Sequence, residues 1–289
     1  MKIDAPGRWE DLDVERWSGP ILVFGGNNSG KTTFARYLLG RLRQRGSRVG
    51  YVDVDLGQST VGPPTTVGLA LSNEEVGGEE FPPAGPRRIC FVGNNHPHGH
   101  LHRIFLHLHR FFLFLTKREV DTWVVDTSGL VDPHHAGADL KWGMVDLFRP
   151  CRVLALTDED ELSPILSPLR RLPDVHVQEL PISSAVVERS QRQRRSYRAD
   201  RYRDYFEPAS TVPLQWSGLA VFPRPEFVPG QIVGLEGDRG FARALGIVER
   251  ADDDVVWLRT PWHGDAEGIA TLRLGELHID EETFQDERI

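Results

Sequence analysis

The sequence has few cysteines, no long hydrophobic run and no excess of basic charge. Its 289 residues include only Cys90 and Cys151, which excludes a disulfide scaffold and favours a reducing compartment. The longest apolar stretch, 104–115, is interrupted by two histidines and an arginine, and it is shorter than the ~20 residues that span a bilayer. The first 17 residues carry charges throughout, which argues against a secretory signal. We therefore expect a cytoplasmic protein with no membrane partner.

The lack of basic excess at first argues against a nucleic-acid partner. The chain carries 34 Lys and Arg against 42 Asp and Glu, a net charge of −8, whereas proteins that bind nucleic acid are usually basic. The charge is unevenly distributed, however. Residues 231–289 hold 14 acidic and 6 basic residues, which accounts for the whole net charge, while seven arginines lie within 189–203. The total charge therefore does not exclude a phosphate-rich partner.

The order of apolar runs predicts an α/β fold followed by a small all-β region. Strand-like runs lead up to Asp55, Gly93, Asp126 and Asp158, and helical spacing covers 34–46 and 101–116. Such alternation indicates a mostly parallel sheet flanked by helices. After about residue 211, short alternating runs rich in glycine and proline replace the helical pattern, which indicates β structure. We predict an α/β domain over 1–208 and a β domain over 209–289.

A glycine-rich segment between the first strand and the first helix fits the P-loop pattern G-x-x-x-x-G-K-[ST]. Glycines allow backbone N–H groups to point at phosphate oxygens, and the helix N-terminus adds a positive dipole end. The lysine would reach the β- and γ-phosphates, and the threonine hydroxyl would bind Mg²⁺. The alternative, a strand–helix turn that matches by chance, is disfavoured by the context on both sides. The predicted nucleotide-binding residues are Gly25, Asn27, Asn28, Ser29, Gly30, Lys31, Thr32 and Thr33.

Carboxylates follow two of the predicted strands. Asp53 and Asp55 end the strand-like run before Gly57, and Asp126 ends another. Side chains at the carboxyl ends of parallel strands project into the ligand crevice, so one carboxylate can order the metal shell and another can accept a proton from an attacking hydroxyl. We predict Thr32, Asp53 and Asp126 as the metal-binding residues. Capping of a turn is the structural alternative for each aspartate.

The arginine-rich segment predicts a helix with a cationic face. Arg194, Arg198 and Arg201 are spaced three or four residues apart and so share one side of a helix. Guanidinium groups match phosphate oxygens and can neutralise a phosphoryl group during transfer. The structural alternative is an ordinary solvated basic helix, which is what most charge runs are.

A histidine cluster follows the third strand-like run. Alternating histidines can bind metal, but the cluster has no neighbouring cysteine and its spacing does not match a structural zinc site. We expect some of these residues to lie on a substrate-facing loop and the others to lie partly exposed on the next helix. The cluster comprises His96, His98, His100, His102, His107 and His109.

Five stretches in order make the sequence similar to a known family, the P-loop polynucleotide 5′-hydroxyl kinases. This family includes the kinase subunit of the eukaryotic mRNA cleavage factor, nucleolar rRNA-processing kinases and shorter archaeal relatives, which the chain resembles most. The resemblance extends from about Ile21 to Leu274. The stretches are GGNNSGKTT, DVDLGQSTVGPPTTVGLAL, FVGNNHPHGH, VVERSQRQRRSYRADRYRDYF and GQIVGLEGDRGFARALGIVE.

The resemblance implies a kinase that uses ATP and Mg²⁺ to phosphorylate the 5′-hydroxyl end of RNA, DNA or both. It implies that Asp55 is the catalytic base, that Lys31 holds phosphate, and that Arg194 and Arg198 close over the transferred group. Substrate would be positioned by Gln58 and by the 93–99 loop, including Gly93, Asn94, Asn95 and His98.

The sequence departs from the family at two places. Eukaryotic members have a tryptophan that clasps the terminal nucleotides where this chain has Leu130, so stacking would be weakened there or moved to residues such as His98 or Trp142. They also have an N-terminal β domain that helps to hold the base of ATP. About 20 residues precede the first strand here, and within them Trp9 or Trp17 could cover the adenine.

Three other functions remain as alternatives at this point. The chain could be a nucleotide-binding scaffold of a nucleic-acid-processing complex without turnover, a P-loop kinase of a small metabolite, or a nucleotide-driven metal-insertion protein. The complete set of lysine, threonine, aspartate and two arginines favours the polynucleotide kinase.

Overall fold

The computed structural model describes residues 5–46, 48–72, 80–132, 136–158, 160–264 and 266–289. The chain divides into two compact units, and both are discontinuous in sequence. Each unit is described by itself below. Unit 1 consists of Met1–Asp55, Leu69–Arg87 and Leu101–Glu188, and unit 2 consists of Leu56–Gly68, Arg88–His100 and Arg189–Ile289.

Unit 1 is built on a parallel sheet in the order β2-β5-β1-β6-β7. Every residue of β2 and β5 is buried, because helices cover both faces of such a sheet and its strands are apolar without interruption. The parallel α/β fold expected from the sequence is therefore confirmed. The strands are β1 (Gly19–Gly25), β2 (Val49–Asp53), β5 (Thr122–Asp126), β6 (Cys151–Leu156) and β7 (Val175–Leu180).

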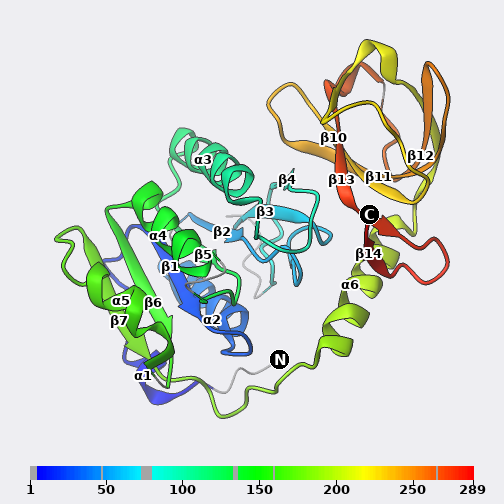
Figure 1. Cartoon of the computed structure of the whole chain (residues 1–289). Coiled ribbons are helices and arrows are strands. Elements are labelled where there is room, and N and C mark those ends of the chain that lie inside the picture. The colour runs from blue at the N-terminus through cyan, green and yellow to red at the C-terminus, as the bar shows by residue number, and fades with distance from the viewer. Residues whose placement is uncertain (1–4, 47, 73–79, 133–135, 159, 265) are drawn as a thin grey trace. The chain divides into compact units, whose positions relative to one another are not determined.

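The helices of unit 1 pack on this sheet and on one another (Figure 1). Helix α2 (Lys31–Gln44) lies on β1, β2 and β5, while α3 (Leu101–Lys117) packs on α4 (Gly137–Phe148), which contacts β1. The short helices are α1 (Gly7–Glu10), η2 (Asp160–Leu162) and α5 (Ser163–Leu169). In the described part of the chain, no helix combines the length and apolar character that crossing a bilayer requires.

Tryptophan 9 joins the N-terminal segment to the rest of unit 1. Trp9 of α1 is fully buried, and its ring packs edge-on against Phe34 of α2 at a centroid distance of 4.8 Å. Its indole N–H donates to the carbonyl of Pro181. This burial makes Trp9 a core residue, and it gives no support to the idea that Trp9 covers an adenine.

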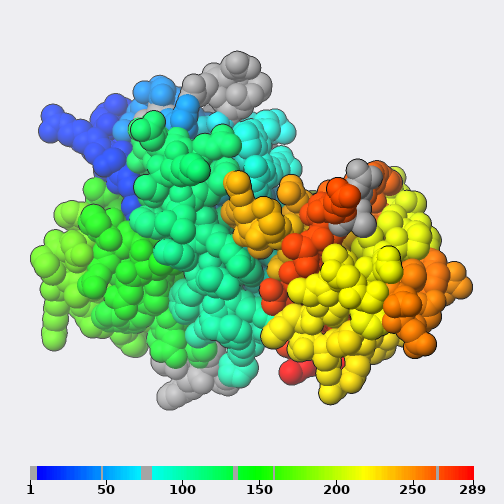
Figure 2. Space-filling model, turned by 90° about the horizontal axis from the view of Figure 1, so that it is seen from above, coloured from blue at the N-terminus to red at the C-terminus, as the bar shows by residue number. Residues whose placement is uncertain are grey.

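Unit 2 contains the predicted C-terminal β structure. Strands β14, β13, β10, β11, β12 and β8 follow one another in antiparallel pairs, and β9 pairs in parallel with β13. They gather into one body, yellow to red in Figure 2. The elements are β8 (Ser210–Gln215), η3 (Trp216–Gly218), β9 (Ala220–Phe222), β10 (Gln231–Glu236), β11 (Ala242–Ala251), β12 (Val255–Thr260), η4 (Ala266–Gly268), β13 (Thr271–Ile279) and β14 (Asp286–Arg288).

Three segments from before residue 209 also belong to unit 2. They are 56–68, 88–100 and the stretch from 189 that forms helix α6 (Gln191–Phe206). Strands β3 (Thr66–Leu71) and β4 (Arg87–Phe91) contribute residues to both units. The arginine-rich helix therefore packs with the β structure, and the division of the chain into 1–208 and 209–289 stays a prediction.

Candidate active site

The P-loop connects the end of β1 to the start of α2. Asn28 and Gly30 have φ angles of 60° and 78°, which curl the backbone in front of the helix N-terminus. A Cβ on Gly25 would lie 2.3 Å from Ser29 Oγ, so the loop closes too tightly for a side chain there. Together with the positive end of the helix dipole, these features are typical of a loop that binds phosphate.

Two side chains of the loop fasten it from within. Buried Lys31 donates through Nζ to the carbonyl of Gly26 and, at 3.3 Å, to Ser29 Oγ. Ser29 Oγ in turn donates to the same carbonyl at 2.9 Å. Thr32 is half-buried and Thr33 is exposed. The P-loop residues that the sequence predicts therefore lie together.

The three predicted aspartates lie at the carboxyl ends of neighbouring strands in unit 1. Asp53 on β2 is the register partner of Asp126 on β5, so both carboxylates leave the sheet at the same level. The backbone N–H of Val54 donates to the carbonyl of Asp126, and that of Asp55 donates to Asp53 Oδ1 at 3.0 Å. Asp55 is half-buried and lies two residues beyond the end of the strand.

Asp126 has the properties of a cation ligand. Burial raises its pKa to about 6, the charge of Asp55 adds to this effect, and Thr32, Lys31 and Tyr51 oppose it. The Tyr51 hydroxyl donates to Oδ2 at 3.0 Å. Oδ1 is buried and has no hydrogen-bond partner among the described residues. A buried carboxylate oxygen beside a hydroxyl and a second aspartate suits a hard divalent cation.

Lys141 is a functional candidate that the sequence reasoning missed. It lies fully buried in α4, and its Nζ donates to Thr127 Oγ1 at 2.7 Å and to the carbonyl of Ser128 at 2.6 Å. Burial first, and the charge of Lys31 second, lower its pKa well below the ordinary value. Lys141 thus fastens the turn that follows Asp126. The signal available in the sequence was a lysine in line with Met144, Val145 and Phe148 on the apolar stripe of a helix.

The turn after Asp126 also contacts the P-loop. A Cβ on Gly129 would lie 2.9 Å from the Cα of Asn27, so the two backbones approach closely. The Thr127 hydroxyl donates to the carbonyl of Val23 on β1 at 2.7 Å. Leu130, which follows, is half-buried. Unit 1 therefore brings together the P-loop, the three aspartates and Leu130.

Unit 2 holds the remaining predicted site residues. Gln58 donates through Nε2 to the carbonyl of Arg194 at 3.4 Å, which places it against α6. In the 93–99 loop, Asn94 is buried and His98 is exposed. Gly93, Asn94, Asn95, His98, Gln58, Arg194 and Arg198 all belong to this unit.

Helix α6 begins at a complete capping box. Ser190 Oγ accepts from the Gln193 N–H at 3.3 Å, and the Gln193 side chain accepts from the Ser190 N–H at 2.8 Å. Arg198 forms a bidentate ion pair with Asp286, and Arg201 donates to the carbonyl of Gly62 at 3.0 Å. Arg198 and Arg201 therefore contact protein groups within unit 2.

The histidines are spread over different environments. His100 is buried, with Nε2 at 3.3 Å from Glu276 Oε2, and His107 on α3 is also buried, with Nδ1 at 2.9 Å from an Arg110 nitrogen. Within the described ranges, no three His, Cys, Asp or Glu side chains are arranged to hold a metal ion.

The sequence is similar to known proteins over much of its length. Residues 25–208 match the family model described as mRNA cleavage and polyadenylation factor CLP1 P-loop. A polyribonucleotide 5′-hydroxyl-kinase of Methanocaldococcus jannaschii is 30% identical over 201 residues, which cover 70% of this chain and 54% of that protein. One of Pyrococcus horikoshii is 29% identical over 201 residues, with 70% and 53% covered.

The fold also matches solved structures. A chain in the solved structure of a Clp1p–Pcf11p complex superposes with a TM-score of 0.68 over 94% of this chain and 77% of that one, at 13% identity. The chain spans about half the length of the curated relatives it matches.

Proposed function

The chain belongs to the family whose model is described as mRNA cleavage and polyadenylation factor CLP1 P-loop, and from this premise we propose that it is a polynucleotide 5′-hydroxyl kinase. It would transfer the γ-phosphate of ATP to the 5′-hydroxyl end of RNA, DNA or both, with Mg²⁺ as cofactor. The names of the archaeal relatives, polyribonucleotide 5′-hydroxyl-kinases, support this reaction. Nucleic acid is then the partner, and RNA is the favoured substrate.

The observation that carries the proposal is the set of groups around Asp126. Its unpartnered buried oxygen lies in the same unit as the P-loop, with Asp53 at the same level of the sheet. The metal would be held by Thr32, Asp53 and Asp126. When bound, Mg²⁺ would supply charge neutralisation on the phosphates. A P-loop that served only as a structural turn would need neither the buried carboxylate of Asp126 nor Asp53 beside it on the neighbouring strand.

Each remaining residue has a proposed role in transfer. The P-loop N–H groups and Lys31 would bind and orient the phosphates, and Asp55 would accept the proton of the attacking 5′-hydroxyl. Arg194 and Arg198 would neutralise charge on the transferred group. Gln58 and the 93–99 loop would hold the nucleic-acid end. Most of the catalysis would come from positioning and charge neutralisation, because phosphoryl transfer requires little covalent chemistry from the protein.

A direct test compares acceptors. The purified chain is incubated with ATP labelled at the γ-position and with a 5′-hydroxyl RNA, the matched DNA, the same oligonucleotides with a 5′-phosphate, or free nucleosides. We expect label on the 5′-hydroxyl oligonucleotides and none on the 5′-phosphate forms.

The same assay separates the alternatives. Label on nucleosides in preference to oligonucleotides would indicate a small-metabolite kinase. ATP binding with no labelled product from any acceptor would indicate a nucleotide-binding scaffold. Either result would overturn the proposal.

A further inference from the structure

The acidic C-terminal strands contain a carboxylate that joins three separate segments of unit 2. Asp286 on β14 has a side chain only 2% exposed. Arg198 of α6 donates to it twice, through Nε at 2.7 Å and through Nη2 at 2.9 Å. Asn95 of the 93–99 loop donates to the same Oδ2 atom. One buried carboxylate therefore holds both the loop and the arginine-rich helix.

A second residue of the C-terminal strands, Glu276, holds the same loop at Gly93 and Asn94 and contacts His100 directly after it. Glu276 on β13 accepts from Asn94 Nδ2 at 2.8 Å and lies 3.3 Å from His100 Nε2. Its backbone N–H donates to the carbonyl of Gly93 at 2.8 Å. Gly93 has a φ of 90°, and a Cβ there would lie 3.0 Å from the Cα of Gly275. The loop is therefore docked on β13 at close backbone range.

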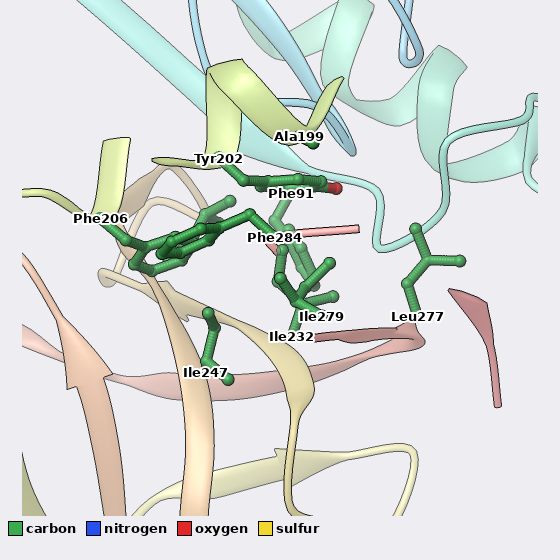
Figure 3. Packing of buried hydrophobic residues seen from close by; sticks show 10 residues of the cluster. Phe91, Ala199, Tyr202, Phe206, Ile232, Ile247, Leu277, Ile279 and Phe284 are labelled. Carbon is green, nitrogen blue, oxygen red and sulfur yellow. The ribbon is translucent and has the colours of Figure 1, made fainter. Parts of the chain in front are cut away.

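Apolar packing attaches α6 to the same strands. Ala199, Tyr202 and Phe206 point from the helix toward the strand side chains, as Figure 3 shows. The fully buried members of this cluster include Tyr202 and Phe206 of the helix and Phe91 at the end of β4. The strand side of the cluster comprises Ile232, Leu245, Ile247, Leu277 and Ile279, together with Phe284.

The helix also holds the segment that carries Gln58. Tyr197 donates to the carbonyl of Ser59 at 3.0 Å, and Arg201 donates to that of Gly62. The segment that carries Gln58 is therefore attached to helix α6, and both α6 and the 93–99 loop are attached to the C-terminal strands.

From these contacts we infer that Asp286 and Glu276 are positioning residues. The C-terminal strands use them to set the 93–99 loop and helix α6 in the arrangement that accepts a nucleic-acid end. The expected effect on phosphate transfer rests on the proposed function, whereas the expected effect on the order of the loop and the helix does not. The acidic residues of the β structure thus act on the reaction through the loop and the helix, and no substrate contact is assigned to them.

The test replaces Asp286 by asparagine, which keeps the shape and removes the charge that faces Arg198. Glu287→Gln is the matched control, because Glu287 is the next residue on β14 and its side chain is exposed. The first readout is hydrogen–deuterium exchange. Removing one partner of a buried ion pair is strongly destabilising, so we expect exchange about tenfold faster or more in both 93–100 and 190–200 in Asp286→Asn. The control should match the wild type.

The second readout is kinetic. Asp286→Asn should lower kcat/KM for a 5′-hydroxyl oligonucleotide about tenfold while the KM for ATP and the exchange of residues 25–33 stay at wild-type values. Asp286→Glu should recover part of the loss, since it keeps the charge. The inference would be overturned by unchanged exchange in both segments. It would also be overturned if the KM for ATP rose by the same factor as the KM for the oligonucleotide.

Two further controls keep the result decisive. If Asp286→Asn does not fold, Glu276→Gln, at a half-exposed site, tests the same prediction on the loop alone, and unchanged exchange in 93–100 would overturn it. If the wild type transfers no phosphate, the proposed function fails, but the exchange comparison still decides whether the two carboxylates hold the loop and the helix.

Discussion

At the scale of single residues, three charged side chains of the folded core hold segments that are not their sequence neighbours: Lys141, Glu276 and Asp286. Their partners are 13 or more residues away for Lys141 and up to 191 residues away for Asp286. Only the folded chain brings these pairs together.

Replacing Lys141 by methionine removes the two hydrogen bonds to the Thr127–Ser128 turn. The buried acceptors lose their donor, so we expect a loss of about 1–3 kcal/mol in the free energy of unfolding, measured by urea denaturation near neutral pH. Lys117→Met is the control, because Lys117 is exposed at the end of α3 and should change the free energy little. Equal stability of the wild type and Lys141→Met near neutral pH would contradict this role.

The same pair of proteins also has an expected pH dependence. Burial lowers the pKa of Lys141 in the folded state, so the unfolded state binds more protons in the range between that lowered pKa and the unfolded value of 10.5. The contribution of Lys141 to stability therefore rises with pH in this range. The difference in unfolding free energy between the wild type and Lys141→Met should grow as the pH is raised from neutral toward 10. A difference that shrinks would show that the buried amine is not disfavoured in its charged form.

Gly129 allows the turn after Asp126 to approach the P-loop. An alanine there would meet the backbone of Asn27, so we expect Gly129→Ala to raise the KM for ATP about tenfold by displacing the loop. Gly40→Ala is the matched control, since a Cβ at Gly40 of α2 meets nothing within 4 Å. It should leave the KM unchanged and raise stability by about 1 kcal/mol. A Gly129→Ala protein with the wild-type KM would show that the close approach is unimportant for nucleotide binding.

The P-loop and the three aspartates follow a strand–turn–helix pattern and strand ends, so they can be predicted directly from the sequence. Lys141, Glu276 and Asp286 follow no such local pattern, because their partners come close only in the folded chain.

At the scale of elements, long periodic segments are predicted and short or mixed ones are not. Strands β1, β2, β5 and β6 and helices α2, α3 and α6 follow clear apolar or charged patterns. In helix α4 a lysine and two glycines interrupt the apolar stripe, and β14 has only three residues, too few to show a pattern. For α6, the sequence predicts the helix and its shared arginine face. That two of these arginines contact an aspartate and a carbonyl depends on contacts that local pattern does not show.

The capping box of α6 is expected to order the turn that carries Arg194. Ser190→Ala removes the side-chain cap and should cost about 1 kcal/mol, seen as faster amide exchange in the first turn and a lower kcat. Ser196→Ala, at an exposed position within the same helix, removes a hydroxyl without a cap and serves as control. Unchanged exchange in 190–195 would contradict the role of the cap.

At the scale of the whole molecule, the uneven charge acquires a structural meaning. The acidic C-terminal region contains Asp286 and Glu276, which face the basic helix and the histidine-bearing loop within unit 2. The sequence predicts the β structure, but a boundary at residue 208 follows a change in composition along the chain. Units are defined by contacts in space, and composition along the chain cannot show that 56–68, 88–100 and α6 pack with the C-terminal strands.

A chain that ends at residue 208 should therefore fold poorly. It would expose Tyr202 and Phe206 of α6, which are fully buried in the whole chain, and leave Arg198 without Asp286. We expect low recovery of native protein and unprotected amides in 189–206 compared with the full chain. A stable 1–208 fragment with protected α6 would instead support an independent domain that ends there.

The most direct test of the central claim is phosphate transfer by the full chain and by Asp55→Ala. With γ-labelled ATP, Mg²⁺ and a 5′-hydroxyl RNA, we predict label at the RNA 5′ end with the wild type and a loss of at least about 100-fold in kcat with Asp55→Ala, at an unchanged KM for ATP. Absence of labelled RNA with the wild type, or transfer at the wild-type rate by Asp55→Ala, would contradict the account.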